Sequence, residues 1–130
     1  MQPKGHVLYC EDHGDTRALM TLVLEQAGFQ VTTVESGAEC LKLAGGPRRF
    51  DLYLLDHTFP DVSGLTVCEE IRKFDAETPI IFYSGRAMPE EKEAAMKAGA
   101  QAYLIKPGNT ADVAEHVAKW VGAGRAPEKE

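Results

Sequence analysis

The sequence predicts one α/β domain in which a parallel β-sheet is covered by helices on both faces. Five short apolar or β-branched segments alternate with five helical segments along the chain, the order typical of strands joined by crossover helices. Several strand segments are apolar at every position, as strands buried on both faces are. The 130 residues suit one domain with its own core, and no segment repeats.

The predicted strands lie between turn or helix signals. The second, Gln30–Val34, is rich in β-branched residues, which favour strands. The third is a continuous apolar run, typical of a strand inside a parallel sheet. In chain order, the five strands are expected at His6–Cys10, Gln30–Val34, 51–55, 79–83 and Ala102–Ile105.

The predicted helices begin and end at recognisable signals. A Ser, Thr, Asp or Asn side chain caps the first turn by accepting a backbone hydrogen bond, Pro suits the first turn, and Gly often follows the last turn. Asp15 is expected to cap the first helix and Ser36 the second. In chain order, the helices are expected at 16–27, from Ser36 to Ala44, from Ser63 or Gly64 to Phe74, at 89–99, and from Asn109 or Thr110 to Val121.

Composition limits the function classes. The formal net charge of −6 argues against nucleic-acid binding by this chain alone. The three cysteines are odd in number and widely spaced, so no disulfide framework is expected and a reducing cytosol fits. No stretch suits a membrane span, and the start shows no signal-peptide pattern. The domain is expected at 1–121, with 122–130 as a flexible tail or the start of a linker.

Polar residues follow four of the predicted strands. Glu11-Asp12 comes after the first strand, Asp56 after the third, Ser84 after the fourth and Lys106 after the fifth. The carboxyl ends of parallel strands meet at one edge of the sheet, where ligands bind. We therefore expect three carboxylates, one hydroxyl and one ammonium in a small site that can hold a divalent cation together with an anionic group.

Two other classes of α/β protein fail on motif spacing. Aspartate-nucleophile phosphatases carry the motif D-x-D-x-[TV] after the first strand. This chain has Glu-Asp-His-Gly-Asp-Thr at 11–16 instead, and no inserted cap domain is expected. Neither G-x-G-x-x-G nor a Walker A loop follows the first strand, which excludes the common nucleotide-binding motifs. His57 is expected to be a loop histidine rather than a base for Asp56, because adjacent residues leaving a strand tend to point apart.

At these residues the chain resembles the receiver domain of two-component response regulators, over roughly 5–121. The resemblance implies a flavodoxin-like (βα)5 three-layer sandwich with strand order 2-1-3-4-5, an order that periodicity alone does not supply. The segments that carry it are, in order, Glu11-Asp12, Asp56, Pro60 and Gly64 in the loop after Asp56, Ser84, Lys-Ala-Gly-Ala at 97–100, Tyr103 and Lys106-Pro107.

The resemblance implies that Asp56 is the phosphoacceptor and that Mg²⁺ is the cofactor, with Mn²⁺ as the alternative ion. It implies that Asp12 and Asp56 bind the metal directly, that Glu11 acts through water, and that the backbone carbonyl of Thr58 supplies another ligand. The first acid of the family's pair is most often Asp. Glu11 is one methylene longer but is still an oxygen donor, so we expect metal binding to survive with altered affinity.

By the same resemblance, Lys106 pairs with Asp56 before phosphorylation and with the phosphoryl oxygens afterwards. The bond before Pro107 is expected to be cis, and Ser84 to donate its hydroxyl to a phosphoryl oxygen. Tyr103 is expected to move inward when Ser84 shifts, which would switch the face of the fourth helix, fifth strand and fifth helix. The alternatives are a Ser84 that only caps a helix and a strand tyrosine that does not switch.

Thr58 and Arg86 occupy positions that tune phosphorylation lifetime in the family, two residues after the acceptor and two after Ser84. Arg86 is expected to reach over the site, where it hinders the water that hydrolyses the acyl phosphate or pairs with the phosphate. An exposed arginine in a mobile loop is the alternative.

The expected function is that of a receiver domain in a phosphorelay, not of an enzyme with an independent substrate. A sensor histidine kinase or a phosphotransfer protein would supply the phosphoryl group. A downstream protein target or an output domain outside this sequence would receive the signal, and a dimer through the fourth helix, fifth strand and fifth helix is a further option. Neither nucleic-acid nor membrane binding is expected. The remaining alternative is a receiver that only mediates protein contacts, although such variants usually lose the acidic residues that this chain keeps.

Overall fold

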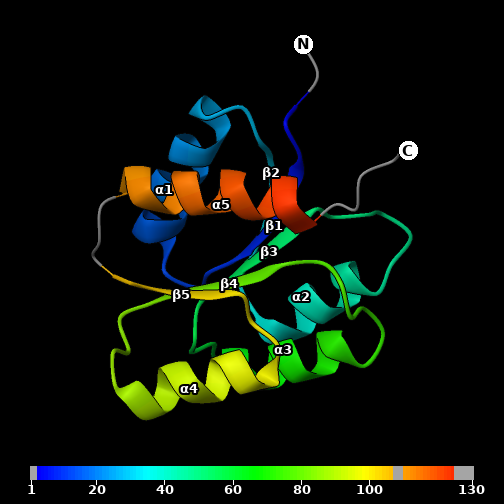
Figure 1. The fold of residues 1–130 in the computed structure, drawn as a ribbon, viewed down its shortest axis with the longest axis vertical. Coiled ribbons are helices and arrows are strands. Elements are labelled where there is room, and N and C mark those ends of the chain that lie inside the picture. Colours follow the sequence, from blue (N-terminus) through cyan, green and yellow to red (C-terminus); the bar gives the residue numbers. More distant parts are fainter. Residues whose placement is uncertain (1–2, 107–109, 125–130) are drawn as a thin grey trace.

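Five parallel strands form one sheet, and helices cover both of its faces (Figure 1). The computed structural model describes residues 3–106 and 110–124. The order of the strands in the sheet is β2-β1-β3-β4-β5, which confirms the predicted flavodoxin-like three-layer sandwich. The strands are β1 (His6–Cys10), β2 (Gln30–Val34), β3 (Leu52–Leu55), β4 (Ile80–Ser84) and β5 (Ala102–Ile105).

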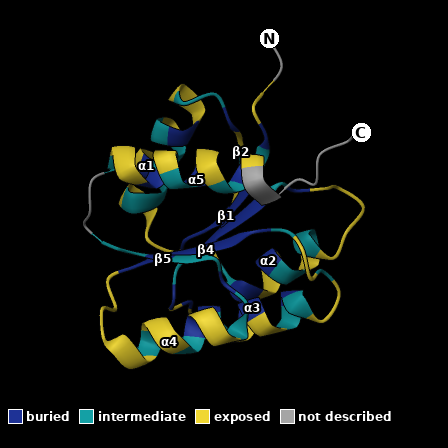
Figure 2. Cartoon of the chain, viewed as in Figure 1, coloured by how far each residue is buried: buried dark blue, intermediate teal, exposed yellow. Residues whose placement is uncertain are grey.

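The helices divide between the two faces of the sheet. They are α1 (Gly14–Gln26), α2 (Gly37–Ala44), α3 (Gly64–Arg72), α4 (Pro89–Ala98) and α5 (Thr110–Gly124). Because alternate strand residues point to opposite faces, the core forms two clusters. Val7 packs in one cluster with Met20 of α1 and Val117 of α5. Leu8 packs in the other with Cys40 of α2 and with residues of α3 and α4. Figure 2 shows the buried strands between helices whose outer faces are exposed.

The predicted cap at Ser36 is present, Ser63 at the predicted start of the third helix also acts as a cap, and the predicted cap at Asp15 is wrong. The Ser36 and Ser63 hydroxyls accept hydrogen bonds from the backbone N–H groups three residues on, at 3.2 and 3.1 Å. Asp15 does not cap α1: His13 occupies the cap position without a side-chain cap bond, and Asp15 lies in the first turn. An acid in that turn still interacts favourably with the helix dipole, which explains why the sequence signal lay so close to the true start.

Element boundaries differ from the predictions by up to three residues. The strands β3 and β4 each begin one residue later than predicted, α3 ends earlier, at Arg72, and α5 runs on to Gly124. The predicted tail at 122–130 therefore begins inside α5, and residues 125–130, Pro107 and Asn109 lie outside the described residues. Within 3–106 and 110–124, no helix has the length and hydropathy needed to cross a membrane.

Candidate functional site

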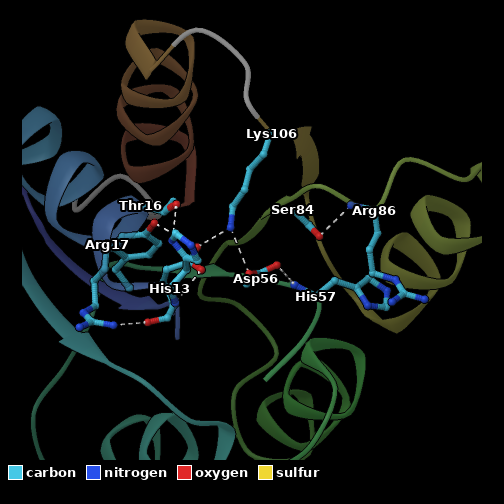
Figure 3. Close-up of polar contacts among 10 residues, drawn as sticks. His13, Thr16, Arg17, Asp56, His57, Ser84, Arg86 and Lys106 are labelled. Carbon is cyan, nitrogen blue, oxygen red and sulfur yellow. Dashed lines mark hydrogen bonds and ion pairs between the residues drawn. The ribbon is translucent and has the colours of Figure 1, made fainter. Parts of the chain in front are cut away.

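The carboxyl ends of the strands bring the predicted site residues together. The backbone N–H of Asp56 donates to the carbonyl of Cys10 at 3.1 Å, so Asp56 leaves β3 beside Glu11 at the end of β1. On the other side of Asp56, the backbone N–H of Lys106 donates to the carbonyl of Ser84 at 2.8 Å. Four strand ends thus meet at one edge of the sheet, where Figure 3 shows Lys106 extending toward Asp56.

Lys106 joins two carboxylates from different strands. Its Nζ lies 2.7 Å from Oε1 of Glu11 and 3.1 Å from Oδ2 of Asp56. The exposed fractions of these side chains are 17% for Lys106, 0% for Glu11 and 13% for Asp56. Burial acts to lower the pKa of Lys106, but the two carboxylates outweigh it and raise that pKa above its ordinary value. Lys106 therefore stays charged at neutral pH.

Glu11 is the most deeply buried charged group of the site. Tyr9 donates its hydroxyl to Oε1 at 3.3 Å, and the backbone N–H of His13 donates to Oε2 at 3.2 Å. Burial raises the pKa of Glu11 above its ordinary value, although the hydrogen bond from Lys106 opposes this shift. The sequence analysis did not identify Tyr9 as a partner of Glu11. The spacing could have indicated it, because residues two apart in a strand point to the same face.

Glu11, Asp12 and Asp56 form an acidic cluster that can hold a metal ion. Each offers a carboxylate oxygen, and these oxygens lie within 4.8 Å of one another. Three carboxylates against the single ammonium of Lys106 leave a formal charge of −2 when all are ionised. The donors are hard oxygens, which Mg²⁺ prefers, and Asp12 is exposed, which leaves room for the waters that Mg²⁺ retains. The cluster therefore fits a divalent cation of this class.

The loop after Asp56 is packed tightly against the start of α3. The backbone N–H of His57 donates to Oδ1 of Asp56 at 2.6 Å, and the N–H of Gly64 donates to the carbonyl of His57 at 2.6 Å. A Cβ atom at Gly64 would lie 2.0 Å from the carbonyl oxygen of Asp56. Thr58, exposed in the same loop, forms an antiparallel bridge with Ser63. These contacts hold the backbone of Asp56 in place.

His57 follows β3 in the predicted loop, but its ring is buried, with 9% exposed. The ring lies 5.9 Å from that of Phe82 and 6.3 Å from that of Tyr103, away from the Asp56 carboxylate (Figure 3). Its Nε2 has no hydrogen-bond partner among the described residues. The sequence did not predict this burial, because the two rings come from β4, which pairs with β3, and from β5 on the far side of β4, and these strands come together only in the folded sheet.

A second group of contacts surrounds Ser84, which is 2% exposed. Its Oγ accepts a hydrogen bond from the backbone N–H of Arg86 at 3.1 Å. Tyr103, buried and stacked on Phe82, donates its hydroxyl to the Arg86 carbonyl at 2.7 Å. Burial raises the pKa of Tyr103, so its hydroxyl remains a donor. The Arg86 side chain pairs with Glu91 of α4 rather than with Asp56 (Figure 3 shows it turned away from Asp56).

Comparison with known proteins places this arrangement in one family. Residues 7–118 match the family model described as response regulator receiver domain. The uncharacterized transcriptional regulatory protein YkoG of Bacillus subtilis (strain 168) is 38% identical over 106 residues, which cover 80% of this chain and 45% of that protein. The chain thus spans less than half the length of that relative.

Two solved structures share the fold along nearly the whole chain. A CheY-like receiver domain protein from Methanospirillum hungatei JF-1 is 25% identical with a TM-score of 0.87, covering 95% of this chain and 97% of that one. The receiver domain of the sensor histidine kinase PA1611 from Pseudomonas aeruginosa PAO1 is 28% identical with a TM-score of 0.83, covering 91% and 98%. That structure has a magnesium ion coordinated in its active-site cleft. The match over residues 7–118 shows that this chain belongs to the response regulator receiver domain family.

Proposed function

We propose that this receiver domain accepts a phosphoryl group on Asp56 from the phosphohistidine of a sensor histidine kinase or a phosphotransfer protein. The observation that carries the proposal is the setting of Asp56. Its two oxygens are held by the ammonium of Lys106 and the backbone N–H of His57, and two further carboxylates lie within 4.8 Å. A nucleophilic carboxylate beside a cation site and a lysine suits phosphoryl transfer.

The reaction is a displacement at phosphorus. An oxygen of Asp56 forms a bond to phosphorus as the phosphorus–nitrogen bond to the donor imidazole breaks, and that electron pair stays on the donor. Lys106 and His57 hold the carboxylate in one orientation, which removes part of the entropic barrier. The acidic cluster and the Thr58 carbonyl would hold Mg²⁺, whose charge would offset the repulsion between the two anionic groups. Lys106 and the Ser84 hydroxyl then bind the oxygens of the phosphoryl group, which carries a charge of about −1.5 to −2.

The signal leaves through the face formed by α4, β5 and α5. As Ser84 turns toward the phosphoryl group, its contact with the backbone of Arg86 changes, and that backbone also holds the Tyr103 hydroxyl. The new charge thereby biases the position of Tyr103 and of α4. The receiver of this output is a target protein, a second copy or a domain outside this sequence. Three unpaired cysteines, all buried, fit a cytoplasmic location for this exchange.

Trapping the acyl phosphate tests the proposal directly. The full chain is incubated with acetyl phosphate and Mg²⁺, reduced with borohydride, and analysed by peptide mass spectrometry. We expect the modification at Asp56 in the wild-type protein and none in Asp56→Asn. An unlabelled wild-type protein would support the alternative of a receiver that only mediates contacts, and a label at another residue would also contradict the proposal.

Asp12→Asn is expected to weaken Mg²⁺ binding by about tenfold or more, since even the loss of a residue that only supports a metal ligand costs about that much. The substitution keeps the shape of the side chain and removes one charge of the acidic cluster. Isothermal titration calorimetry of the unphosphorylated protein with Mg²⁺ measures the effect. Asp15→Asn removes the same charge from the exposed first turn of α1 and should bind as the wild type does. Equal affinities for both variants would exclude Asp12 as a ligand.

A further inference from the structure

Arg86 connects three parts of the molecule that the proposed function uses. Its backbone N–H donates to the Ser84 hydroxyl at 3.1 Å, and its carbonyl accepts from the Tyr103 hydroxyl at 2.7 Å. Its guanidinium Nε lies 2.5 Å from Oε2 of Glu91 in the first turn of α4. The backbone of Arg86 therefore lies next to the Ser84 hydroxyl, which the proposed function directs at the phosphoryl group. The guanidinium, however, is paired with Glu91.

Glu91 is well placed to retain this guanidinium. Its side chain is 20% exposed, against 54% for Arg86. The hydrogen bond from Arg86 is the largest cause that lowers the pKa of Glu91 below its ordinary value, so the carboxylate is ionised at neutral pH. An acid in the first turn of a helix is further stabilised by the helix dipole. Glu91 therefore presents a persistent anion to Arg86 while Asp56 carries no phosphate.

A phosphoryl group on Asp56 is a second anion for the same guanidinium. Arginine binds phosphate oxygens through paired hydrogen bonds, and these are among the stronger polar contacts in proteins. One guanidinium placed across the phosphoryl oxygens leaves less room for the water that must attack phosphorus. In hydrolysis that water forms a bond to phosphorus, the bond from phosphorus to Asp56 breaks with its electrons returning to the carboxylate, and the water proton passes to solvent.

We propose that Glu91 is a positioning residue that shortens the lifetime of the phosphoryl group by holding Arg86 away from Asp56. The inference rests on the proposed function and adds a competition between Glu91 and the phosphoryl group for one cation. When Arg86 binds the phosphoryl group, its ion pair with Glu91 breaks, and the loop after β4 loses this contact with the first turn of α4. Lifetime and the position of α4 are thereby coupled through the same ion pair.

The size of the effect is limited by the strength of an exposed ion pair, which shifts an equilibrium by a factor of about five at most. Glu91→Gln should therefore slow the loss of phosphate by up to about fivefold. Arg86→Ala should accelerate it by no more than about twofold, since Glu91 already withholds most of the guanidinium in the wild type. The double variant should decay at the rate of Arg86→Ala, because Glu91 acts only through Arg86.

The test removes acetyl phosphate from the phosphorylated wild-type chain and the three variants, and follows the loss of phosphate by trapping the remaining acyl phosphate at successive times. Glu90→Gln, which removes the same charge from the neighbouring position of α4, is the matched control and should decay as the wild type does. A second measurement uses the ¹⁵N–¹H signal of Arg86 Nε, which should shift only in part when the wild type is phosphorylated, because Glu91 retains most of the guanidinium, and should already be shifted in unmodified Glu91→Gln.

The outcomes separate the two proposals. A wild-type protein that takes no label contradicts the proposed function and this inference with it. A labelled wild type with Glu91→Gln decaying equally fast, or faster, contradicts only the role of Glu91. Slower decay in Glu91→Gln that persists in the double variant would show that Glu91 acts by a route other than Arg86, which also overturns the inference.

Discussion

Lys106→Met is expected to lower the free energy of unfolding by about 3 kcal/mol at neutral pH, since removal of one partner of a buried ion pair leaves an uncompensated charge. The Glu11 side chain is fully buried, and Lys106 is its cationic partner at 2.7 Å. The Tyr9 hydroxyl and the His13 N–H would remain, but neither carries a charge. Urea unfolding of the wild type and the variant at pH 8 and pH 5 measures the difference.

The stability that Lys106→Met loses should be greater at high pH than at low pH. The pKa of Glu11 is already raised from 4.5 by burial, and loss of Lys106 raises it further. A raised acid pKa means that stability is highest below about 4.5 and falls as pH rises through the folded-state value. The pKa of Lys106 is raised above 10.5, so its charge is constant over this range. The variant should therefore be closer to the wild type at pH 5 than at pH 8.

Two controls separate this charge effect from lost packing. Glu11→Gln in the Lys106→Met background removes the orphaned carboxylate and should recover much of the lost stability. Lys73→Met removes an ammonium that pairs with Glu70 at the exposed surface and should change stability little. A Lys106→Met protein as stable as the wild type at pH 8, or a double variant no more stable than the single one, would show that the ion pair does not carry this energy.

Gly64→Ala is expected to destabilise the fold by about 3 kcal/mol, the upper end for an added methyl group in a packed site. The new Cβ would lie 2.0 Å from the carbonyl oxygen of Asp56 and 3.0 Å from Cα of His57. Both are backbone atoms, so no side-chain rotation relieves the overlap. The start of α3 or the loop after Asp56 must move, and the Mg²⁺ affinity of the acidic cluster should fall together with the free energy of unfolding.

Gly122→Ala is the matched control for this substitution. Nothing lies within 4 Å of a Cβ at Gly122 in α5, so alanine there should stabilise the protein by about 0.5–1 kcal/mol through its higher helix propensity. Urea unfolding gives both values, and a Mg²⁺ titration follows the site. If Gly64→Ala unfolded at the wild-type urea concentration, the close approach of α3 to the Asp56 backbone would not be a structural requirement.

The site illustrates which contacts a linear pattern can predict. Glu11, Asp56 and Lys106 each follow a strand, and parallel strands end at a common edge, so their meeting was predictable from the sequence. The pairing of Lys106 with Asp56 was implied only by the resemblance to a family, and its contact with Glu11 was not predicted at all, because that contact joins residues 95 positions apart in the chain. The same limit applies to His57, whose burial depends on rings contributed by two other strands.

Arg86 shows the same limit for a surface side chain. Its position two residues after Ser84 placed it beside the predicted site, but the sequence did not show whether its side chain faces Asp56 or an acid of the next helix. The choice between them depends on how α4 starts. Pro89 opens that helix and brings Glu91 into its first turn, facing the Arg86 guanidinium at 2.5 Å. A sequence search for acids in first turns near an unpaired arginine would have found Glu91 as a candidate.

The sequence by itself determined the alternation of strands and helices, most of their boundaries, and the residues that stand at the strand ends, because periodicity, capping and chain order are local properties. The strand order was available only through resemblance to a family. The tertiary structure alone decided that Glu11 is buried against Lys106, that His57 is buried near Phe82 and Tyr103, and that Arg86 faces Glu91. These outcomes depend on distances between residues far apart in the chain, and local pattern contains no information about such distances.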